Sequence, residues 1–247
     1  MTNAKERIIK RGGAMGMEKM IGRVTGFLGV ALLILMFGGC SLITGMTQKD
    51  ADVRKNLADG LAEMRPDEAE WVRSSDATLT LVEATWLHGW QVFDVYVFLA
   101  PHPQRFYAAL SDDGTALVLS GSSDSFLQMI RSAQIVVDNA SAAADIGTLY
   151  LDVTRDFYRW SYRIDSLSDI QWVLTPDREQ QRIEIEAQYG ALVQPPAPEP
   201  SDSGWSITVW MVYDLSLIRH HLLISADGAV QDTPDVVETD MPVPESF

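Results

Sequence analysis

The sequence predicts an α+β fold in which an antiparallel β-sheet of about seven or eight strands carries helices packed on one face. Two observations support this prediction. Short runs of alternating apolar and polar residues are separated by the tight-turn pairs Asp113-Gly114 and Asp227-Gly228, which is typical of antiparallel strands. Between these runs, apolar residues recur every three or four positions over 126–140, which is typical of a helix.

The segment 40–75 is polar and has helical spacing. Its apolar residues recur at intervals of three or four, at Val53, Leu57, Leu61 and Met64. Pro66 then interrupts the pattern, and Asp67 can cap a short second turn. We therefore expect a tether or a first helix ahead of the main α+β domain, which is placed at 76–226.

Strands are predicted in the segment that follows. Residues 78–82 and 93–99 alternate and are rich in β-branched and aromatic side chains, and Gly89 lies between them as a turn. Residues 106–119 are predicted to form a hairpin, because their Asp-Gly pair supplies the positive φ that a tight turn requires.

A helical region comes next. Residues 122–124 offer N-cap side chains, and the apolar spacing that begins at Phe126 continues to Trp160 with a break at 139–141. Residues 149–153 also alternate, so both a helix and a strand stay open for them.

Strands return in the last third of the chain. A half-buried strand is predicted from the alternation of Ile183, Ile185, Ala187 and Tyr189 with polar residues. A proline-rich loop at 194–204 precedes two further strands, at 205–213 and 217–224. From Asp227 onward there are six acids, three prolines and no base, so the acidic segment 227–247 is expected to be disordered.

Two segments of the chain resemble each other. One begins at Gly89 and ends at Gly114, and the other begins at Gly204 and ends at Gly228. Each consists of a strand, a short break, a second strand and an Asp-Gly turn, which raises the hypothesis of a duplicated α-β-β-β unit. The candidate repeats are 77–121 and 181–228. An ordinary antiparallel meander would produce the same pattern.

The N-terminal segment has the layout of an export signal. Residues 24–46 carry no charge, and the first 39 residues hold six of the 19 bases but two of the 34 acids. A positively charged start, a short apolar run and small residues at a cleavage point define a signal peptide. Residues 1–39 are therefore predicted to be a signal peptide or a membrane anchor.

The residues Phe37-Gly38-Gly39-Cys40 end the apolar run. They resemble the lipobox of bacterial prolipoproteins, in which an aliphatic and two small residues precede a cysteine; Phe37 stands in place of the usual leucine. The resemblance implies that Cys40, the one cysteine of the chain, is acylated and becomes the new N-terminus. Each buried methylene contributes about 0.8 kcal/mol, so two or more acyl chains anchor a protein stably.

The same segment admits a second interpretation. About 20 apolar residues suffice to cross a bilayer, so the chain could be a single-pass membrane protein with a structural or assembly role in the envelope. Both interpretations place the acidic domain outside the cytoplasm, at the cell membrane or the outer membrane, facing the periplasm or the extracellular side.

Charge argues against one class of partner. Beyond the first 39 residues, the chain holds 13 bases and 32 acids. Such an excess of acid repels the phosphates of nucleic acids and of anionic lipid headgroups. We therefore expect no nucleic-acid partner.

The sequence carries no recognised catalytic or metal-binding motif. Its histidines, which are His88, His102, His220 and His221, have no Cys, Asp or Glu at metal-ligand spacing. Neither a G-x-S-x-G elbow nor a glycine-rich phosphate loop occurs. The expectation is a protein with no metal, no cofactor and no enzymatic activity.

Aromatic residues supply the candidate binding surface. Tryptophans along a sheet can hold a small apolar ligand, and core packing is their other role. The candidates are Trp86, Trp90, Trp205 and Trp210. The sequence thus predicts a membrane-anchored, non-enzymatic lipoprotein of the cell envelope that binds a protein partner or a small apolar ligand.

Overall fold

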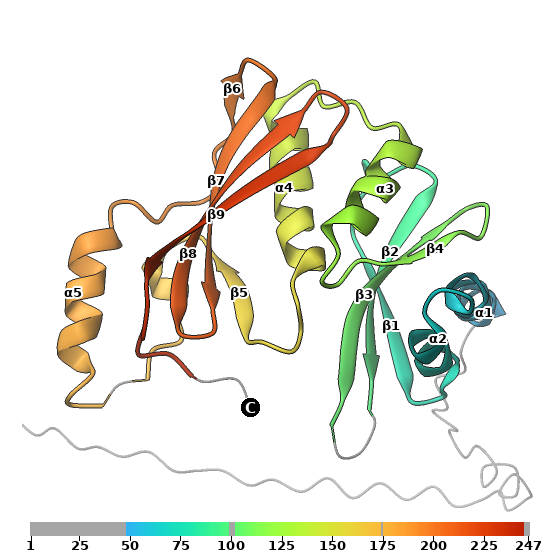
Figure 1. Ribbon diagram of the computed structural model, residues 1–247, viewed down its shortest axis with the longest axis horizontal. Helices are drawn as coiled ribbons and strands as arrows, with labels where there is room; N and C mark the ends of the chain where they lie inside the picture. The colour runs from blue at the N-terminus through green and yellow to red at the C-terminus, as the bar shows by residue number, and fades with distance from the viewer. Residues whose placement is uncertain (1–47, 99–101, 174, 245–247) are drawn as a thin grey trace, which may run out of the picture. The chain divides into compact units, whose positions relative to one another are not determined.

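The fold is α+β, as predicted, but its strands form two sheets instead of one (Figure 1). The computed structural model describes residues 48–98, 102–173 and 175–244. These residues form five α-helices, one short 3-10 helix and nine strands. All strand pairs within the described residues are antiparallel.

The first sheet is a meander with a pair of helices on one face. Its strands lie in the order β1 (Ala77–Val82), β2 (Trp90–Val97), β3 (Gln104–Ser111) and β4 (Ala116–Val118). The covering helices are α1 (Gln48–Leu61) and α2 (Pro66–Arg73), so the predicted first helix occurs and the short second turn is a full helix. The N-cap of α2 is Arg65, with Pro66 at the first helical position, so the cap predicted at Asp67 is wrong. Helix and strand residues share one buried cluster, which includes Leu57, Leu61, Val72, Phe93, Val95 and Phe106.

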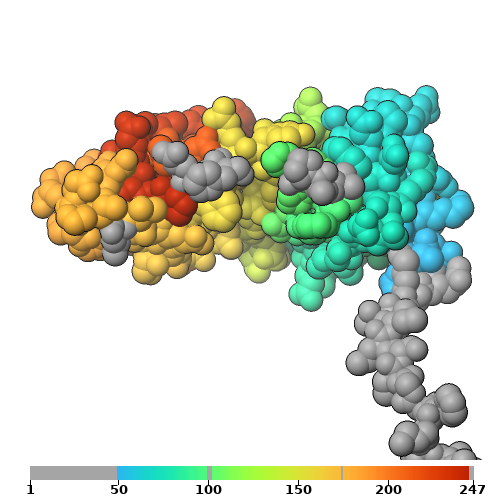
Figure 2. Space-filling view, turned by 90° about the horizontal axis from the view of Figure 1, so that it is seen from below, coloured from blue at the N-terminus to red at the C-terminus, as the bar shows by residue number. Residues whose placement is uncertain are grey.

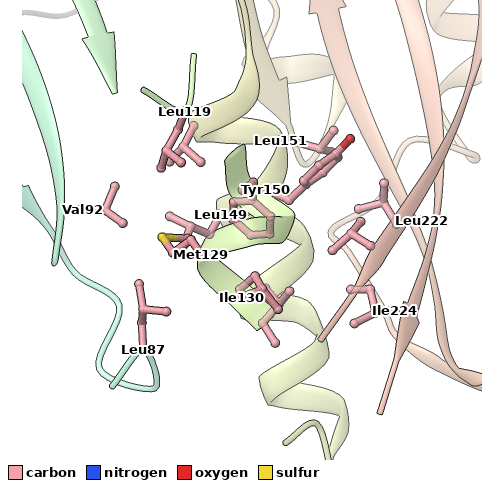
Figure 3. Packing of buried hydrophobic residues seen from close by; sticks show 14 of the residues in the cluster. Leu87, Val92, Leu119, Met129, Ile130, Leu149, Tyr150, Leu151, Leu222 and Ile224 are labelled. Atoms are coloured by element: carbon pink, nitrogen blue, oxygen red, sulfur yellow. The ribbon is translucent and has the colours of Figure 1, made fainter. Parts of the chain in front are cut away.

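The helices α3 (Ser123–Ala133) and α4 (Ala140–Thr154) lie between the two sheets (Figures 1 and 3). Ser122 and Asn139 cap them, each accepting a hydrogen bond from a backbone N–H of the first turn. Residues 149–153 belong to α4. Their apolar alternation arises because α4 contacts strands on two sides, and a helix buried on several faces is apolar around most of its circumference.

The second sheet is a meander as well. Its strands lie in the order β5 (Ser161–Ile164), β7 (Gly204–Tyr213), β8 (Ser216–Ser225) and β9 (Val230–Glu238), and β6 (Glu199–Ser201) pairs with part of β7. One face joins α3, α4 and the first sheet in a central cluster, which includes Val92, Met129, Ile130, Tyr150, Leu222 and Ile224 (Figure 3). Trp90 belongs to the same cluster. The other face packs against η1 (Leu167–Asp169), α5 (Glu179–Tyr189) and residues 241–243. Helices therefore cover both faces of each sheet, in contrast to the predicted single face.

The strand predicted around Ile183 is wrong, because residues 179–189 form the helix α5. Ile185 and Tyr189, four residues apart, are buried, whereas Ile183 is 45% exposed. Arg182 pairs with Glu179 and Glu186 on neighbouring turns. Such pairs at spacings of three and four residues stabilise a helix, and the segment consists largely of residues with high helix propensity.

The disorder predicted for 227–247 is also wrong for the residues that the structure describes there. Residues 230–238 form β9, which pairs with β8. Met241 and Val243 are buried in the cluster beneath α5. The acidic residues of β9 do not prevent its pairing with β8. Strand β9 lies at the edge of the sheet, where water or a neighbouring cation can reach their side chains.

Each meander has the same type of turn before its last strand. The Ser111 side chain donates to Asp113, its backbone N–H donates to Thr115, and Gly114 donates back to its carbonyl. The same hydrogen bonds recur 114 positions later at Ser225, with Asp227, Ala229 and Gly228 as partners. The strand that matches β1 is β5, not residues 181–189, so the second repeat was placed incorrectly. Duplication itself stays a prediction.

Candidate functional site

The four candidate tryptophans do not form one surface. Trp90 is buried in the central cluster, and Trp205 packs against that cluster. Trp210 is buried on the opposite face of the second sheet. Trp86 is half-buried and borders a groove. Trp86 also packs against the central cluster, so core packing applies to all four positions. Trp86 is the one of the four that also lines the groove, so it stays a candidate contact for a partner.

The groove beside Trp86 has a volume of about 330 Å³ and is called here the acidic groove. One wall is the end of β1 and the connection to β2, and the other wall is α4. Its lining residues are Val82, Glu83, Ala84, Thr85, Trp86, Asp145, Thr148, Leu149 and Asp152. The four residues from α4 occur at spacings of three, four and seven, which places them on one face of the helix.

Asp152 is the least solvated acid of this groove. Burial raises the pKa of the Asp152 carboxyl, while the nearby guanidinium groups of Arg163 and Arg155 act in the opposite direction. Within the described residues, the Asp152 carboxylate makes no hydrogen bond. A half-buried carboxylate of this kind favours contact with a cationic group, which would compensate its lost hydration.

An aromatic segment begins three residues after Asp152. The ring of Phe157 contacts two guanidinium groups, with 5.0 Å from the ring centre to Cζ of Arg105 and 4.8 Å to Cζ of Arg155. The Phe157 ring also contacts Tyr107, with 5.3 Å between ring centres. Arg155 is held by a 2.6 Å hydrogen bond to the carbonyl oxygen of Ser161. Stacked guanidinium groups fix the ring orientation, so this part of the loop is preorganised.

The remainder of the segment is exposed. Tyr158 is 83% exposed and Trp160 is 41% exposed. Trp160 makes an edge contact with Tyr162, and Arg159 pairs with Asp214 at 2.8 Å. The view in Figure 2 shows yellow atoms of this part of the chain at the surface. Residues 155–160 are called the aromatic segment below. Arg155 joins it to the acidic groove, because the same guanidinium group acts on Asp152 and packs on Phe157.

A second groove, of about 380 Å³, lies beside the turn after β3. His88, Trp90, Asp112 and Asp113 line it together with residues from α3. Hydrogen bonds from Ser111 and Thr115 lower the pKa of Asp113. The equivalent residue, Asp227, has the same bonds at the other turn, so Asp113 has a structural role in closing the turn.

The histidines have ordinary partners or lie at the surface. Nδ1 of His220 lies 2.9 Å from the Asp232 carboxylate, and Nδ1 of His221 lies 3.4 Å from the Thr208 hydroxyl. His88 and His102 are exposed. Among the described residues, no three His, Cys, Asp or Glu side chains are arranged to hold a metal ion.

The predicted lipid-attachment residues lie outside the described part of the chain; they are Phe37, Gly38, Gly39 and Cys40. In the part of the chain that is described, we find no helix with the length and apolar character needed to cross a bilayer. No protein-family model, curated protein or solved structure matches this chain significantly.

Sequence reasoning missed the two features that define the site. Asp145, Thr148, Leu149 and Asp152 show helical spacing, but the ambiguity of 149–153 hid it. The run Phe157-Tyr158-Arg159-Trp160 was treated as part of a helix, although three aromatic residues and an arginine in succession are a composition that protein interfaces favour.

Proposed function

We propose that this protein is a membrane-anchored lipoprotein of the cell envelope, without enzymatic activity, whose exported domain binds a protein partner. The anchor is Cys40, as the resemblance to prolipoproteins implies. The partner contacts the aromatic segment and the adjoining acidic groove. The alternative anchor, an uncleaved transmembrane helix over residues 24–46, predicts the same position for the domain.

The observation that carries the proposal is the exposure of Tyr158 and Trp160 on a loop in which the Arg155 guanidinium packs on the ring of Phe157. Tyrosine, tryptophan and arginine dominate the energetic centres of protein interfaces, because they bury large area at low entropic cost. A small apolar ligand has less support, because Trp90, Trp205 and Trp210 contact packed apolar neighbours.

The anchor is tested by metabolic labelling of the cells that produce the protein with a fatty-acid analogue. The proposal predicts that the parent protein is labelled, and that a Cys40→Ala variant is unlabelled and keeps its precursor size. Labelling that persists in the variant would contradict acylation at Cys40. An unlabelled parent that stays in the membrane fraction would instead support the transmembrane anchor.

The partner surface is tested by placing a photo-crosslinking amino acid at Tyr158 in the full-length protein. We expect one major crosslinked adduct that is lost when Trp160 is changed to Ala. Two controls use exposed apolar residues elsewhere: crosslinking from Met64 should not give this adduct, and Leu192→Ala should preserve it. Equal adduct yields from Tyr158 and Met64 would contradict a specific partner surface.

A further inference from the structure

Strand β1 is an edge strand with unused backbone groups. It pairs with β2 alone in the first sheet. The Ala77 N–H donates to Ser74, and its carbonyl accepts from Arg54, so the backbone groups of Ala77 point away from β2. Residues two apart in a strand share this direction, so the backbone groups of Leu79 and Leu81 also point outward. Within the described residues, these outward groups have no hydrogen-bond partner.

The two faces beside this edge differ in character. On the face covered by α1 and α2, Leu79 packs against the buried cluster, whereas the Leu81 side chain is 54% exposed. On the other face, Val82 packs against the central cluster and borders the acidic groove. A strand added at this edge would therefore meet an apolar side chain on one face and the groove on the other.

The groove side selects for positive charge. Glu83, Asp145 and Asp152 line it, and no Lys or Arg does. The indole of Trp86 borders the same groove and can receive a cation on its face. An ammonium or guanidinium group would supply the half-buried Asp152 with the charged hydrogen-bond donor that it lacks among the described residues.

We propose that a segment of the partner protein binds as an added β-strand along the free edge of β1, with apolar side chains toward Leu81 and lysine or arginine side chains toward the acidic groove. The recognised pattern is therefore a short alternation of apolar and basic residues. This inference rests on the proposed function, since it names the chemistry of the partner. Backbone hydrogen bonds to Leu79 and Leu81 supply sequence-independent affinity, and the alternating side chains supply specificity.

A second copy of this chain is a poorer occupant of the edge. Pairing two β1 edges would bring no lysine or arginine of the strand to either groove, because residues 77–82 contain none. A basic segment is instead complementary to the acids of the groove.

The test uses the full-length protein in detergent micelles and three synthetic peptides of seven residues. The first alternates valine and lysine, the second has the same composition in two blocks, and the third alternates valine and glutamate. Binding is measured by fluorescence anisotropy. We expect the alternating lysine peptide to bind at least about tenfold more tightly than the block peptide, and the glutamate peptide to bind more weakly still.

Backbone pairing is measured directly by amide hydrogen exchange. Bound peptide should slow the exchange of the Leu79 and Leu81 amides. The Leu81→Pro variant removes one outward N–H at an edge position where proline is tolerated, and it should weaken binding at least about tenfold. Asp152→Asn should weaken binding of the lysine peptide several-fold, while Glu63→Gln, an exposed acid on the helical side, serves as the matched control.

The proposal falls if the block peptide binds as tightly as the alternating one, or if the protected amides lie elsewhere. It also falls if the protein without peptide dimerises with protection of Leu79 and Leu81. Because the exchange measurement uses the parent protein, it decides the question even if Leu81→Pro fails to fold. A crosslinked adduct from Tyr158 that survives intact in Leu81→Pro would leave the proposed function standing and overturn this inference alone.

Discussion

Arg155 shows how one side chain can organise a surface. Its guanidinium group donates to the carbonyl of Ser161, packs on the ring of Phe157, and lies close enough to Asp152 to act on its pKa. Its Nε is buried and has no hydrogen-bond partner within the described residues. Arginine suits this position because a planar cation can stack on an aromatic ring and donate hydrogen bonds in its plane at the same time.

At this scale, Asp152→Asn is expected to increase the free energy of unfolding slightly at neutral pH. Burial raises the pKa of Asp152 above its ordinary value of 3.8, so its ionised form is disfavoured in the folded state. The folded protein holds this proton more tightly than the unfolded chain. Above the pKa of Asp152 in the folded protein, the full free-energy cost of ionising this carboxyl opposes folding. This cost disappears as the pH falls through that pKa toward the ordinary value of 3.8.

The measurement is urea unfolding of parent and variant at several pH values. The stability advantage of Asp152→Asn should shrink as the pH falls, and the variant Glu63→Gln, at an exposed acid, serves as the control. The charges of Arg155, Arg163 and Asp165 also act on Asp152. The acids Glu83 and Asp145 line the same groove. An advantage that grows with acidification would contradict the assigned direction.

At the scale of the element, α5 illustrates how period and propensity can disagree. Ile183 and Ile185 are two residues apart, which fits a strand, and Ile185 and Tyr189 are four apart, which fits a helix. The charged residues decide between them. Arg182 lies one turn from both Glu179 and Glu186, and these contacts exist only in the helical conformation.

The helix predicts different effects for two isoleucines that are two positions apart. Ile185→Ala should lower the free energy of unfolding by about 2–4 kcal/mol, because it leaves a cavity beside Tyr189. Ile183→Ala should change stability by less than about 0.5 kcal/mol, because this side chain faces solvent. Chemical denaturation measures both, and equal losses would instead indicate a strand with both isoleucines on one face.

Strand β9 predicts a large effect of truncation. Ending the chain after Gly228 removes the partner of β8 and the buried Met241 and Val243. The truncated protein should lose several kcal/mol of stability, since a paired strand and two core side chains are lost together. A chain that ends after Pro244 is the control. Equal melting temperatures for the two shortened chains would contradict the role of β9.

At the scale of the whole molecule, the central cluster links both sheets through α3 and α4. Val92 comes from the first sheet, and Leu222 and Ile224 come from the second (Figure 3). Separating either sheet from these helices would expose apolar residues of the shared cluster. Shared burial of this kind produces cooperative unfolding.

We therefore expect residues 48–244 to unfold in a single transition. Tryptophan fluorescence and far-ultraviolet circular dichroism should give the same midpoint, since tryptophans occupy clusters on both sides of the second sheet. Two separated transitions would show that the meanders are independently stable and would contradict the shared core.

Sequence patterns predicted much of the fold and little of the site. The helix that ends before Pro66, the cap at Ser122 and the two Asp-Gly turns follow from local chemistry, and each occurs as expected. The site was missed because Asp152 and Trp86 are distant in sequence, and no local signal places them on one groove. Exposure of Tyr158 also depends on what the rest of the chain leaves uncovered.

The sequence by itself determined the α+β class, most helix and turn positions, and the acidic character of the chain beyond residue 39, because these depend on composition and on neighbours a few positions apart. It also contains the uncharged segment 24–46 and Cys40, on which the proposed anchor rests. Tertiary structure alone decided that the strands divide into two sheets, that residues 179–189 are helical, and that acid-rich residues 230–238 pair as a strand. The physical reason is that each of these depends on free energy from contacts between distant segments, which local periodicity does not encode.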